Sequence, residues 1–478
     1  MRNSVSRLRL GAALALGVTV SACSTISSVT NTVFSAAPPE GATGHVSGFL
    51  GGVAADEPRA AVVARQVLSQ GGTAADAAVA LGFALSVTLP SRASLGGGGA
   101  CLAYSPGRDS VNQGVPEAIV FTPTAPARAS AAADRPAAVP MMARGLFALQ
   151  ARYGKRPFDS LIVQAEQMAR FGVPASRAFV RDLTLVAGPL FADPAARAAF
   201  SHNGTPIGEG EQLIQPELGS TLAQIRTAGV GDFYQGALAH RLVDAAPRAG
   251  ATFTIDDLRS ALPRTLPPVT LQNGRDMVAF LPPPADGGLA AAAAFAVLQN
   301  DPAAYDRAQA RAMAVAARWR AAGGDPTALL TADLPPGSLP ELPASTTFVT
   351  LDRDGNAVAC ALTMNNLFGT GRIIPGTGLL LAASPSVFPP PLLATAIAWN
   401  EPLHAFRAGV GGSGQAAAPL AAAAAMMNTL RTSQPMATPV PDPGRANVIA
   451  CSRYLPDNEG SCGWATDPRG AGLAIGSD

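Results

Sequence analysis

The segment that most constrains the fold is residues 74–89, which is apolar on nearly every side of a helix. A helix of this kind must be buried on several faces rather than along one stripe. Residues 58–70 before it have apolar residues at helical spacing, and Gly71-Gly72 can take the positive φ that ends a helix. The chain therefore needs a layer of buried helix, covered on both sides by other elements.

The pattern changes from helices to strands at residue 345. Residues 345–351 and 357–364 are rich in strand-forming residues, and the turn residues Asp, Gly and Asn at 352–356 separate them. This arrangement predicts a β-hairpin. Helices first and a hairpin later, with a buried helical layer, indicate a layered α+β fold.

Four glycines, Gly96 to Gly99, precede the apolar, strand-like segment 100–104. A glycine run at this place suits close backbone packing. A phosphate-binding loop would need a lysine after its last glycine, but Lys155 is the only lysine of the chain. The run is therefore not a nucleotide-binding loop.

The N-terminus has the features of a bacterial lipoprotein signal. Arginines precede the apolar run 10–20, which is too short to span a bilayer and ends in Val-Ser-Ala-Cys. The pattern predicts a signal peptide at 1–22, cleavage before Cys23, lipidation of its thiol, and a flexible tether at 23–43. Because no aspartate follows Cys23, the expected location is the periplasmic face of the outer membrane.

Composition excludes several classes of function. The net charge is +1 and the basic residues are spread along the chain, so nucleic-acid binding is not expected. The four histidines, at 45, 202, 240 and 404, lie far apart and show no metal-ligand spacing. Neither a metal nor another cofactor is predicted.

The cysteines divide into two pairs once Cys23 is set aside. Cys451 and Cys462 bracket a short loop, which favours a disulfide in an oxidising compartment. Cys101 and Cys360 lie in apolar, strand-like segments, where buried inert thiols are the expected state.

Ten segments in order along the chain together resemble the gamma-glutamyltranspeptidase family. Four of them are GGTAADAAVA at 71–80, SLGGGG at 94–99, DRDGNAV at 352–358 and FGTG at 368–371. The others include YGKRPF at 153–158, QPEL at 215–218, GGS at 411–413 and DPR at 467–469. One glycine motif would be weak support, but a series from residue 71 to residue 469 is specific.

The resemblance implies an αββα sandwich of the N-terminal-nucleophile hydrolase type. Members of the family cut their own chain and free an N-terminal threonine, whose hydroxyl attacks a γ-glutamyl amide with its own α-amino group as base. When the DRDGNAV turn at 352–358 is aligned with the family without a gap, Ser345 falls on the position of that threonine. The chain then divides into a large-subunit-like region, 44–344, and a small-subunit-like region, 345–478. Thr346 is the alternative nucleophile, but it faces the other side of the strand.

The resemblance also implies further site residues. Thr363 matches a threonine that contacts the nucleophile, and Asn365 matches a residue that touches the substrate. Gly411 and Gly412 match the pair whose N–H groups form the oxyanion hole. Taken singly, these residues are equally typical of strand ends and turns.

The chain departs from the family in its substrate anchors. Thr122 stands where the family has the arginine that binds the substrate's α-carboxylate. The segment 382–387, which normally supplies an acid for the α-amino group, contains none. Since a zwitterion needs charged partners to offset its desolvation, an ordinary γ-glutamyl donor should bind poorly unless other residues, such as Arg372 or Arg407, take over.

Two functions remain open from the sequence. The first is a self-processing amidohydrolase or acyltransferase of the envelope, a heterodimer after cleavage, acting on a small-molecule or peptide amide of the kind found in glutathione metabolism. The second is a non-enzymatic envelope scaffold that keeps the family core. The retained residues favour the first, and the lost anchors favour the second.

Overall fold

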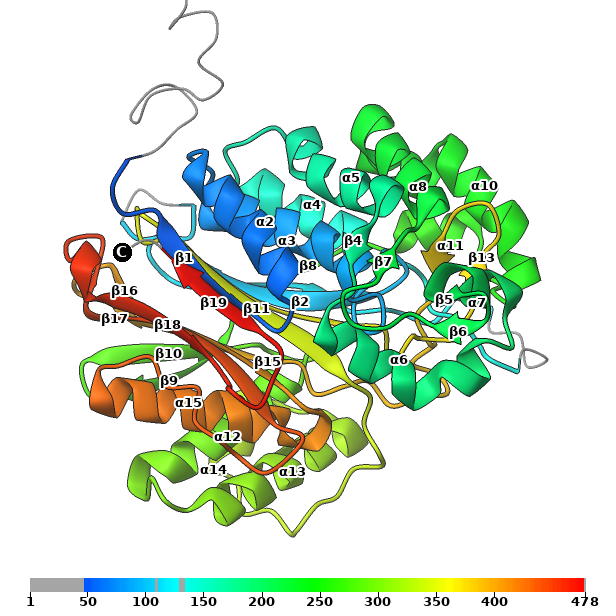
Figure 1. Ribbon diagram of the computed structural model, residues 1–478. Coiled ribbons are helices and arrows are strands. Elements are labelled where there is room, and N and C mark those ends of the chain that lie inside the picture. The colour runs from blue at the N-terminus through cyan, green and yellow to red at the C-terminus, as the bar shows by residue number, and fades with distance from the viewer. Residues whose placement is uncertain (1–46, 108–110, 129–133, 477–478) are drawn as a thin grey trace, which may run out of the picture. The chain divides into compact units, whose positions relative to one another are not determined.

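The structure is a computed structural model that describes residues 47–107, 111–128 and 134–476 (Figure 1). The predicted signal peptide, Cys23, the tether and His45 lie outside these residues. The described residues from Gly48 onward form one compact unit. Among the residues described, no helix combines the length and the apolar character needed to cross a bilayer.

Two antiparallel sheets form the centre of this unit. The first has the strand order β19 (Leu473–Gly476), β1 (Gly51–Ala55), β11 (Ser345–Asp352), β12 (Ala357–Thr363), β2 (Gly98–Tyr104), β3 (Glu117–Phe121) and β8 (Arg264–Leu266). The second has the order β18 (Cys462–Thr466), β17 (Arg445–Leu455), β16 (Ala405–Ser413), β15 (Ala394–Asn400), β10 (Asp276–Phe280) and β9 (Val269–Asn273). Small two-stranded ribbons are β4 (Val173–Pro174) with β7 (Gln212–Leu213), β5 (Ser201–His202) with β6 (Thr205–Pro206), and β13 (Ile373–Ile374) with β14 (Leu379–Leu380).

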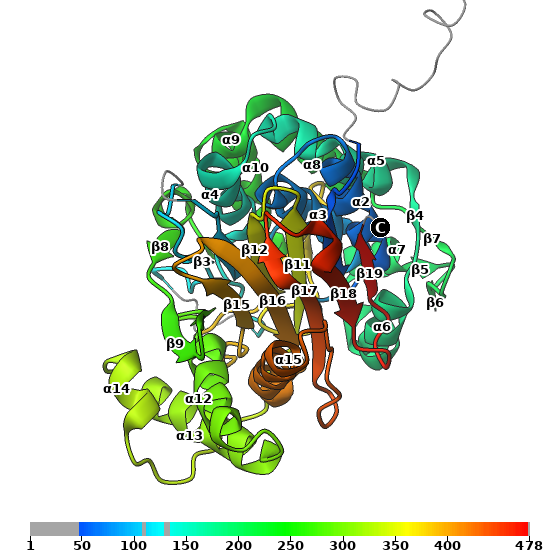
Figure 2. The ribbon, with the colours of Figure 1, turned by 90° about the vertical axis from the view of Figure 1, so that its left-hand side faces the viewer.

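Helices cover the outer face of each sheet (Figures 1 and 2). On the first sheet lie α2 (Pro58–Ser69), α3 (Ala74–Thr88), α4 (Met142–Tyr153) and α5 (Val163–Phe171). The same side holds α6 (Arg177–Leu190), α7 (Pro194–Phe200), α8 (Pro216–Ala228), α9 (Val230–Gln235), α10 (Ala237–Ala245) and α11 (Ile255–Ser260). The second sheet is covered by α12 (Gly287–Asn300), α13 (Tyr305–Ala322), α14 (Pro326–Thr331) and α15 (Ala418–Thr432). The predicted four-layer αββα sandwich is confirmed.

Helix α3 shows why the sequence requires layers. Thr73 and Asp76 form a capping box that begins the helix, and every residue from Ala74 to Thr88 is buried. One side of α3 packs on the first sheet and the other sides on neighbouring helices, within one core cluster. The all-round apolar pattern therefore predicted its environment correctly.

The predicted boundary at 344/345 is not a boundary between folded domains. In the first sheet, β1 lies between β19 and β11, and β12 pairs with β2, so strands from both sides of the boundary share one sheet. The second sheet likewise joins β10 to β15. The division into large and small regions stays a prediction about chain cleavage.

The structure contains two disulfides in the described part of the chain. Cys451 pairs with Cys462, as their spacing suggested. Cys101 also pairs with Cys360, so the expectation of two free thiols was wrong. The reason is strand register: β2 and β12 are neighbours and place the two cysteines directly opposite each other.

Candidate active site

The first residue of β11, Ser345, lies directly opposite Thr363 on β12. Both side chains are almost completely buried. The Thr363 hydroxyl donates a hydrogen bond to the carbonyl oxygen of Ala344 over 3.2 Å and accepts one from the Asn365 N–H over 2.9 Å. A fixed donor thus polarises the carbonyl of the peptide bond that precedes Ser345.

Alternation along β11 places Ser345 and Thr346 on opposite faces of the sheet. Val349 and Leu351 belong to the core between the two sheets, whereas Phe348 belongs to the core under the helices. Ser345 therefore faces the second sheet, as Thr363 does, and Thr346 faces the helical layer.

Thr346 has polar partners of its own. Its hydroxyl is 3.2 Å from an Asp56 carboxylate oxygen, which also accepts from the Thr347 N–H over 2.9 Å. The other Asp56 oxygen accepts from the Asn447 side chain over 2.9 Å. Asp56 therefore fixes the start of β11, and Thr346 remains the alternative nucleophile.

Asn365 directs its side chain toward the protein main chain. Its amide nitrogen donates to the Ala383 carbonyl over 3.1 Å, and the side chain is buried. This contact ties the hairpin to the segment 382–387, where the hydroxyls of Ser384 and Ser386 are 2.8 Å apart. The predicted contact of Asn365 with substrate stays a prediction.

Gly411 and Gly412 lie near the end of β16, on the sheet that faces Ser345. A methyl group added to Gly411 would come within 2.7 Å of the Thr347 Cβ, on the same face of β11 as Ser345. The missing side chain thus lets the two sheets approach closely beside Ser345. This packing role does not test the predicted oxyanion hole.

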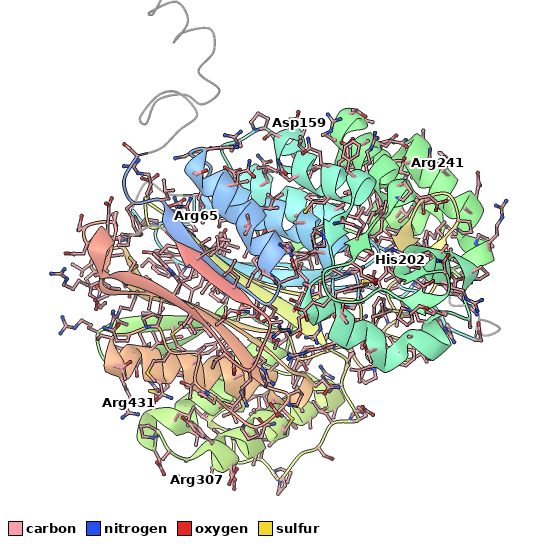
Figure 3. All side chains as sticks on the ribbon, viewed as in Figure 1. Arg65, Asp159, His202, Arg241, Arg307 and Arg431 are labelled. Carbon is pink, nitrogen blue, oxygen red and sulfur yellow. A yellow bond between two sulfur atoms is a disulfide. The ribbon has the colours of Figure 1, made fainter. Side chains whose placement is uncertain are left out.

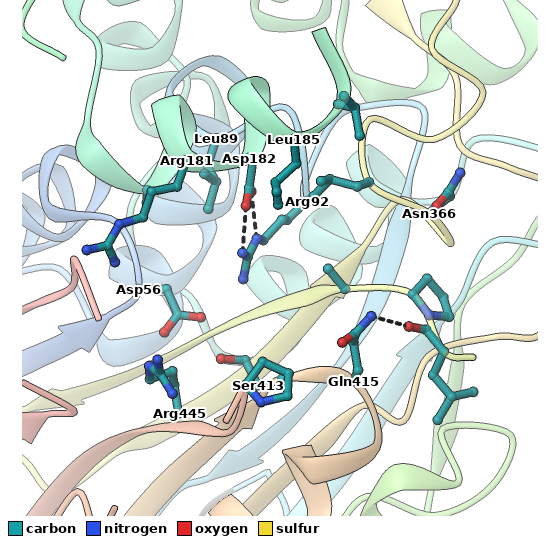
Figure 4. Close-up of a pocket in the computed structure, with 18 of the residues that line it drawn as sticks. Asp56, Leu89, Arg92, Arg181, Asp182, Leu185, Asn366, Ser413, Gln415 and Arg445 are labelled. Atoms are coloured by element: carbon teal, nitrogen blue, oxygen red, sulfur yellow. Dashed lines mark hydrogen bonds and ion pairs between the residues drawn. The ribbon is translucent and has the colours of Figure 1, made fainter. Parts of the chain in front are cut away.

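A cavity of about 690 Å³ opens beside Ala344 (Figure 4). Its walls come from the β1 end, the loop after α3, helix α6, the segment before Ser345, the loops after β12 and before β15, and the end of β16. The charged residues that line it are Asp56, Arg92, Arg181, Asp182, Glu341 and Arg445. The site is therefore a charged recess next to a polarised peptide bond.

Arg92 is held firmly in this recess. Its guanidinium makes two 2.7 Å hydrogen bonds to Asp182, which also accepts from the Ser91 hydroxyl (Figure 4). Burial alone would lower the pKa of Arg92, but the Asp182 carboxylate outweighs it and raises that pKa. The remaining guanidinium nitrogen lies 3.3 Å from the Ser345 carbonyl oxygen, so a permanent cation contacts the first peptide group of β11.

The structure does not bring the other expected anchors to this cavity. Thr122 lines a separate cavity of about 380 Å³, and it follows β3, three strands from β11 in the sheet. At about 4.8 Å per strand, that is about 14 Å, beyond the reach of a threonine. Arg372 instead pairs with Asp134, and the buried Arg407 donates to the Cys451 carbonyl. Neither arginine lines the cavity beside Ala344, and the idea that one of them binds the donor stays a prediction.

Sequence reasoning missed the polar residues that line the recess. Arg92 lies two residues before the glycine-run motif at 94–99, and its charge there was a usable signal. Arg181 and Asp182 looked like ordinary helix-surface residues, and only tertiary packing turns them toward the cavity. Asp56 carried no signal, because none of the motifs or predicted elements includes it.

Metal ligation finds no support in the described ranges. His202 is exposed on the outside of the molecule (Figure 3), and no group of three or more His, Cys, Asp or Glu there could hold a metal ion. The labelled arginines Arg241, Arg307 and Arg431 lie on three different helices and are exposed (Figure 3).

A sequence profile of gamma-glutamyltranspeptidase matches residues 60–333, more than half of the chain. The chain belongs to the gamma-glutamyltranspeptidase family. Within the family, a glutathione hydrolase proenzyme of Escherichia coli is 29% identical over 387 residues, covering 69% of this chain and 65% of that protein. Glutathione hydrolase 3 of Arabidopsis thaliana is 34% identical over 248 residues, covering 50% of this chain and 38% of the relative. The matches thus span about two thirds or less of these relatives.

Solved structures agree with the family assignment. A cephalosporin acylase from Bacillus halodurans superposes with a TM-score of 0.73 at 19% identity, covering 93% of this chain and 99% of that one, which supports the fold. Helicobacter pylori gamma-glutamyltranspeptidase gives a TM-score of 0.53 at 25% identity, covering 61% of this chain and 88% of that structure.

Proposed function

We propose that this family member is a self-processing N-terminal-nucleophile amidohydrolase or acyltransferase whose nucleophile is Ser345. Its substrate would be a γ-glutamyl or related amide, bound in an altered donor pocket. The observation that carries the proposal is the Thr363 hydroxyl, which donates to the Ala344 carbonyl beside the Ser345 side chain. The E. coli relative is named a glutathione hydrolase proenzyme, which fits a chain that matures by cleavage.

Self-processing would use the groups around the Ala344–Ser345 bond. The Ser345 Oγ attacks the Ala344 carbonyl carbon, the C–N bond breaks, the hydroxyl proton passes to the leaving nitrogen, and the acyl group moves to Oγ as an ester. Water then cleaves the ester, leaving a carboxylate on Ala344 and a free α-amino group on Ser345. The Thr363 hydroxyl stabilises the oxyanion during the first step, because it already points at that oxygen.

Turnover would repeat the same chemistry on an external amide. The α-amino group takes the proton of the Ser345 hydroxyl as Oγ attacks the donor carbonyl, and returns it to the departing amine. The resulting ester at Ser345 is resolved by water or by an acceptor amine. Both stages use the Ser345 hydroxyl as the nucleophile and need a donor for the oxyanion, which is why one site can perform both. The α-amino base becomes available only after self-cleavage.

We also propose that the protein is anchored in the bacterial outer membrane by lipid on Cys23 and faces the periplasm, because Ser24 rather than an aspartate follows the cysteine. The disulfides Cys101–Cys360 and Cys451–Cys462 support an oxidising compartment. Mass analysis of the mature N-terminus tests the anchor, since an unlipidated Cys23 in protein extracted from its native host would overturn it.

The activity is tested by trapping the acyl-enzyme. Purified protein is mixed with an amide donor that releases p-nitroaniline, quenched in acid, digested and analysed by mass spectrometry. The proposal predicts a burst of p-nitroaniline and an acyl group on the peptide that begins with Ser345. Acylation at Thr346 would assign the alternative nucleophile, and absence of any adduct with every donor would favour the scaffold function.

A further inference from the structure

One face of helix α6 forms a wall of the cavity. Its lining residues recur at steps of three or four along the helix, namely Ala178, then Arg181 and Asp182, then Leu185 and Val186. This spacing places them on a single helix face. The helix is therefore the element most suited to select what enters beside Ser345.

Arg181 is the cation of this wall that has no carboxylate partner. Its guanidinium is exposed and makes a 3.5 Å hydrogen bond to the Arg469 carbonyl oxygen. Within the described ranges, no carboxylate oxygen lies within 4.0 Å of it, whereas Arg92 pairs with Asp182 and Arg445 with Asp442. Arg181 is thus available to an anionic group of a ligand (Figure 4).

The acids of the cavity are not available in the same way. Asp182 is committed to Arg92, and both oxygens of Asp56 accept hydrogen bonds from β11 or Asn447. Glu341 is exposed and lies three residues before Ala344, on the segment that cleavage would release from Ser345. The cavity therefore offers a cation without a carboxylate partner to an anion, but no comparable acid to an ammonium group.

Apolar side chains stand at the same opening. Leu185, one helical turn beyond Arg181, is 76% exposed, and Phe388, on the loop before β15, is 36% exposed. Large apolar side chains that remain exposed around a recess are typical of a site that binds the apolar part of a ligand. Charge and apolar surface thus lie within one turn of α6.

We propose that the cavity selects acyl donors that carry a carboxylate on an apolar chain and have no α-ammonium group. Arg181 binds the carboxylate, and Leu185 and Phe388 cover the chain while the donor carbonyl reaches Ser345. This assignment rests on the proposed function and names its substrate class. It places donor recognition on α6, away from Thr122.

The test compares p-nitroanilides that differ in one group. Glutaryl and suberoyl p-nitroanilides carry the carboxylate, pentanoyl and octanoyl p-nitroanilides lack it, and the γ-glutamyl compound adds the ammonium group. For the wild-type protein we expect kcat/KM to be at least about tenfold higher for each carboxylated donor than for its neutral counterpart of equal chain length, because a charge-assisted hydrogen bond is gained. The γ-glutamyl donor should be poorer than glutaryl by about tenfold, since its ammonium group is desolvated without a partner.

Variants identify the residues responsible. Arg181→Gln should reduce the preference for glutaryl over pentanoyl by about tenfold or more, mainly through KM, and Arg181→Lys should restore part of it. Leu185→Ser should reduce the preference for suberoyl over glutaryl. One matched control is Arg177→Gln, because Arg177 also lies on α6 and its exposed ion pair with Glu209 is outside the cavity. The other is Leu403→Ser, which replaces an exposed leucine outside the cavity.

Self-cleavage, followed by intact mass, is read separately from donor preference. A wild-type protein that cleaves itself but prefers the γ-glutamyl or neutral donors overturns the assignment and leaves the proposed function standing. The assignment is also overturned if Arg181→Gln prefers glutaryl over pentanoyl as strongly as the control Arg177→Gln does. A wild-type protein that neither cleaves itself nor turns over any donor overturns the proposed function and this inference with it.

Discussion

At the scale of single residues, the candidate site depends on which hydroxyl faces which layer. Ser345 and Thr363 lie opposite each other on the face toward the second sheet, whereas Thr346 turns toward Asp56. The sequence could predict this alternation, because a strand has a two-residue period. It could not predict that Thr363 donates to the Ala344 carbonyl, since that contact depends on where the preceding loop runs.

Thr363→Val tests this contact, because valine keeps the shape and removes the donor. We expect self-cleavage to slow by about 10²-fold, the usual cost of removing one oxyanion-hole donor. The time course of fragment formation, followed by intact mass, measures the effect. Thr363→Ser should retain most of the rate, and a Thr363→Val protein that cleaves as fast as wild type would remove this threonine from the mechanism.

At the scale of elements, the hairpin β11–β12 is locked to helix α3 by one buried carboxylate. Asp352 accepts from the Ala74 N–H at the start of α3, from the Asp354 and Asn356 N–H groups in the turn, and from the Asn356 side chain. The turn residues predicted the hairpin from sequence. The link to α3 could not be predicted, because the two partners lie 278 residues apart.

This carboxylate gives the fold a specific pH dependence. Burial raises the pKa of Asp352 to about 6, despite the hydrogen bonds that lower it. The folded protein then binds more protons than the unfolded chain between about pH 4 and pH 6, so this group's contribution to stability falls as pH rises through that window. A shift of this size corresponds to about 3 kcal/mol.

Asp352→Asn, which cannot ionise, provides the comparison. We expect the free energy of unfolding of wild type, relative to Asp352→Asn, to fall by about 3 kcal/mol or less between pH 4 and pH 7. Denaturant titrations of both proteins at each pH give this difference. A difference that stays constant, or that grows with pH, would show that Asp352 is ionised throughout.

At the scale of the whole molecule, the interleaved sheets explain how a cut chain could remain one protein. Strand β1 lies between β11 and β19, and β2 pairs with β12 through a ladder that includes the Cys101–Cys360 disulfide. The helical layer and the hairpin predicted a layered α+β fold, and the family resemblance implied the αββα sandwich. The disulfide was not, because two apolar strands give no sign of which residues stand opposite each other.

Fragments ending at Ala344 and beginning at Ser345 should therefore stay together after cleavage. We expect a single species in native mass spectrometry and size-exclusion chromatography, and two fragments only after denaturation and reduction. Denaturation without reduction should leave the fragments joined through Cys101 and Cys360. Separation under native conditions would contradict the interleaved strand order.

The covalent state of the mature chain tests the central claim most directly. Intact mass spectrometry is run on wild type, Ser345→Ala and Thr346→Ala after prolonged incubation. The account predicts fragments divided between Ala344 and Ser345, with summed masses equal to the precursor plus one water, in wild type and Thr346→Ala but not in Ser345→Ala. A wild-type chain that stays intact, or cleavage that persists in Ser345→Ala, would contradict it.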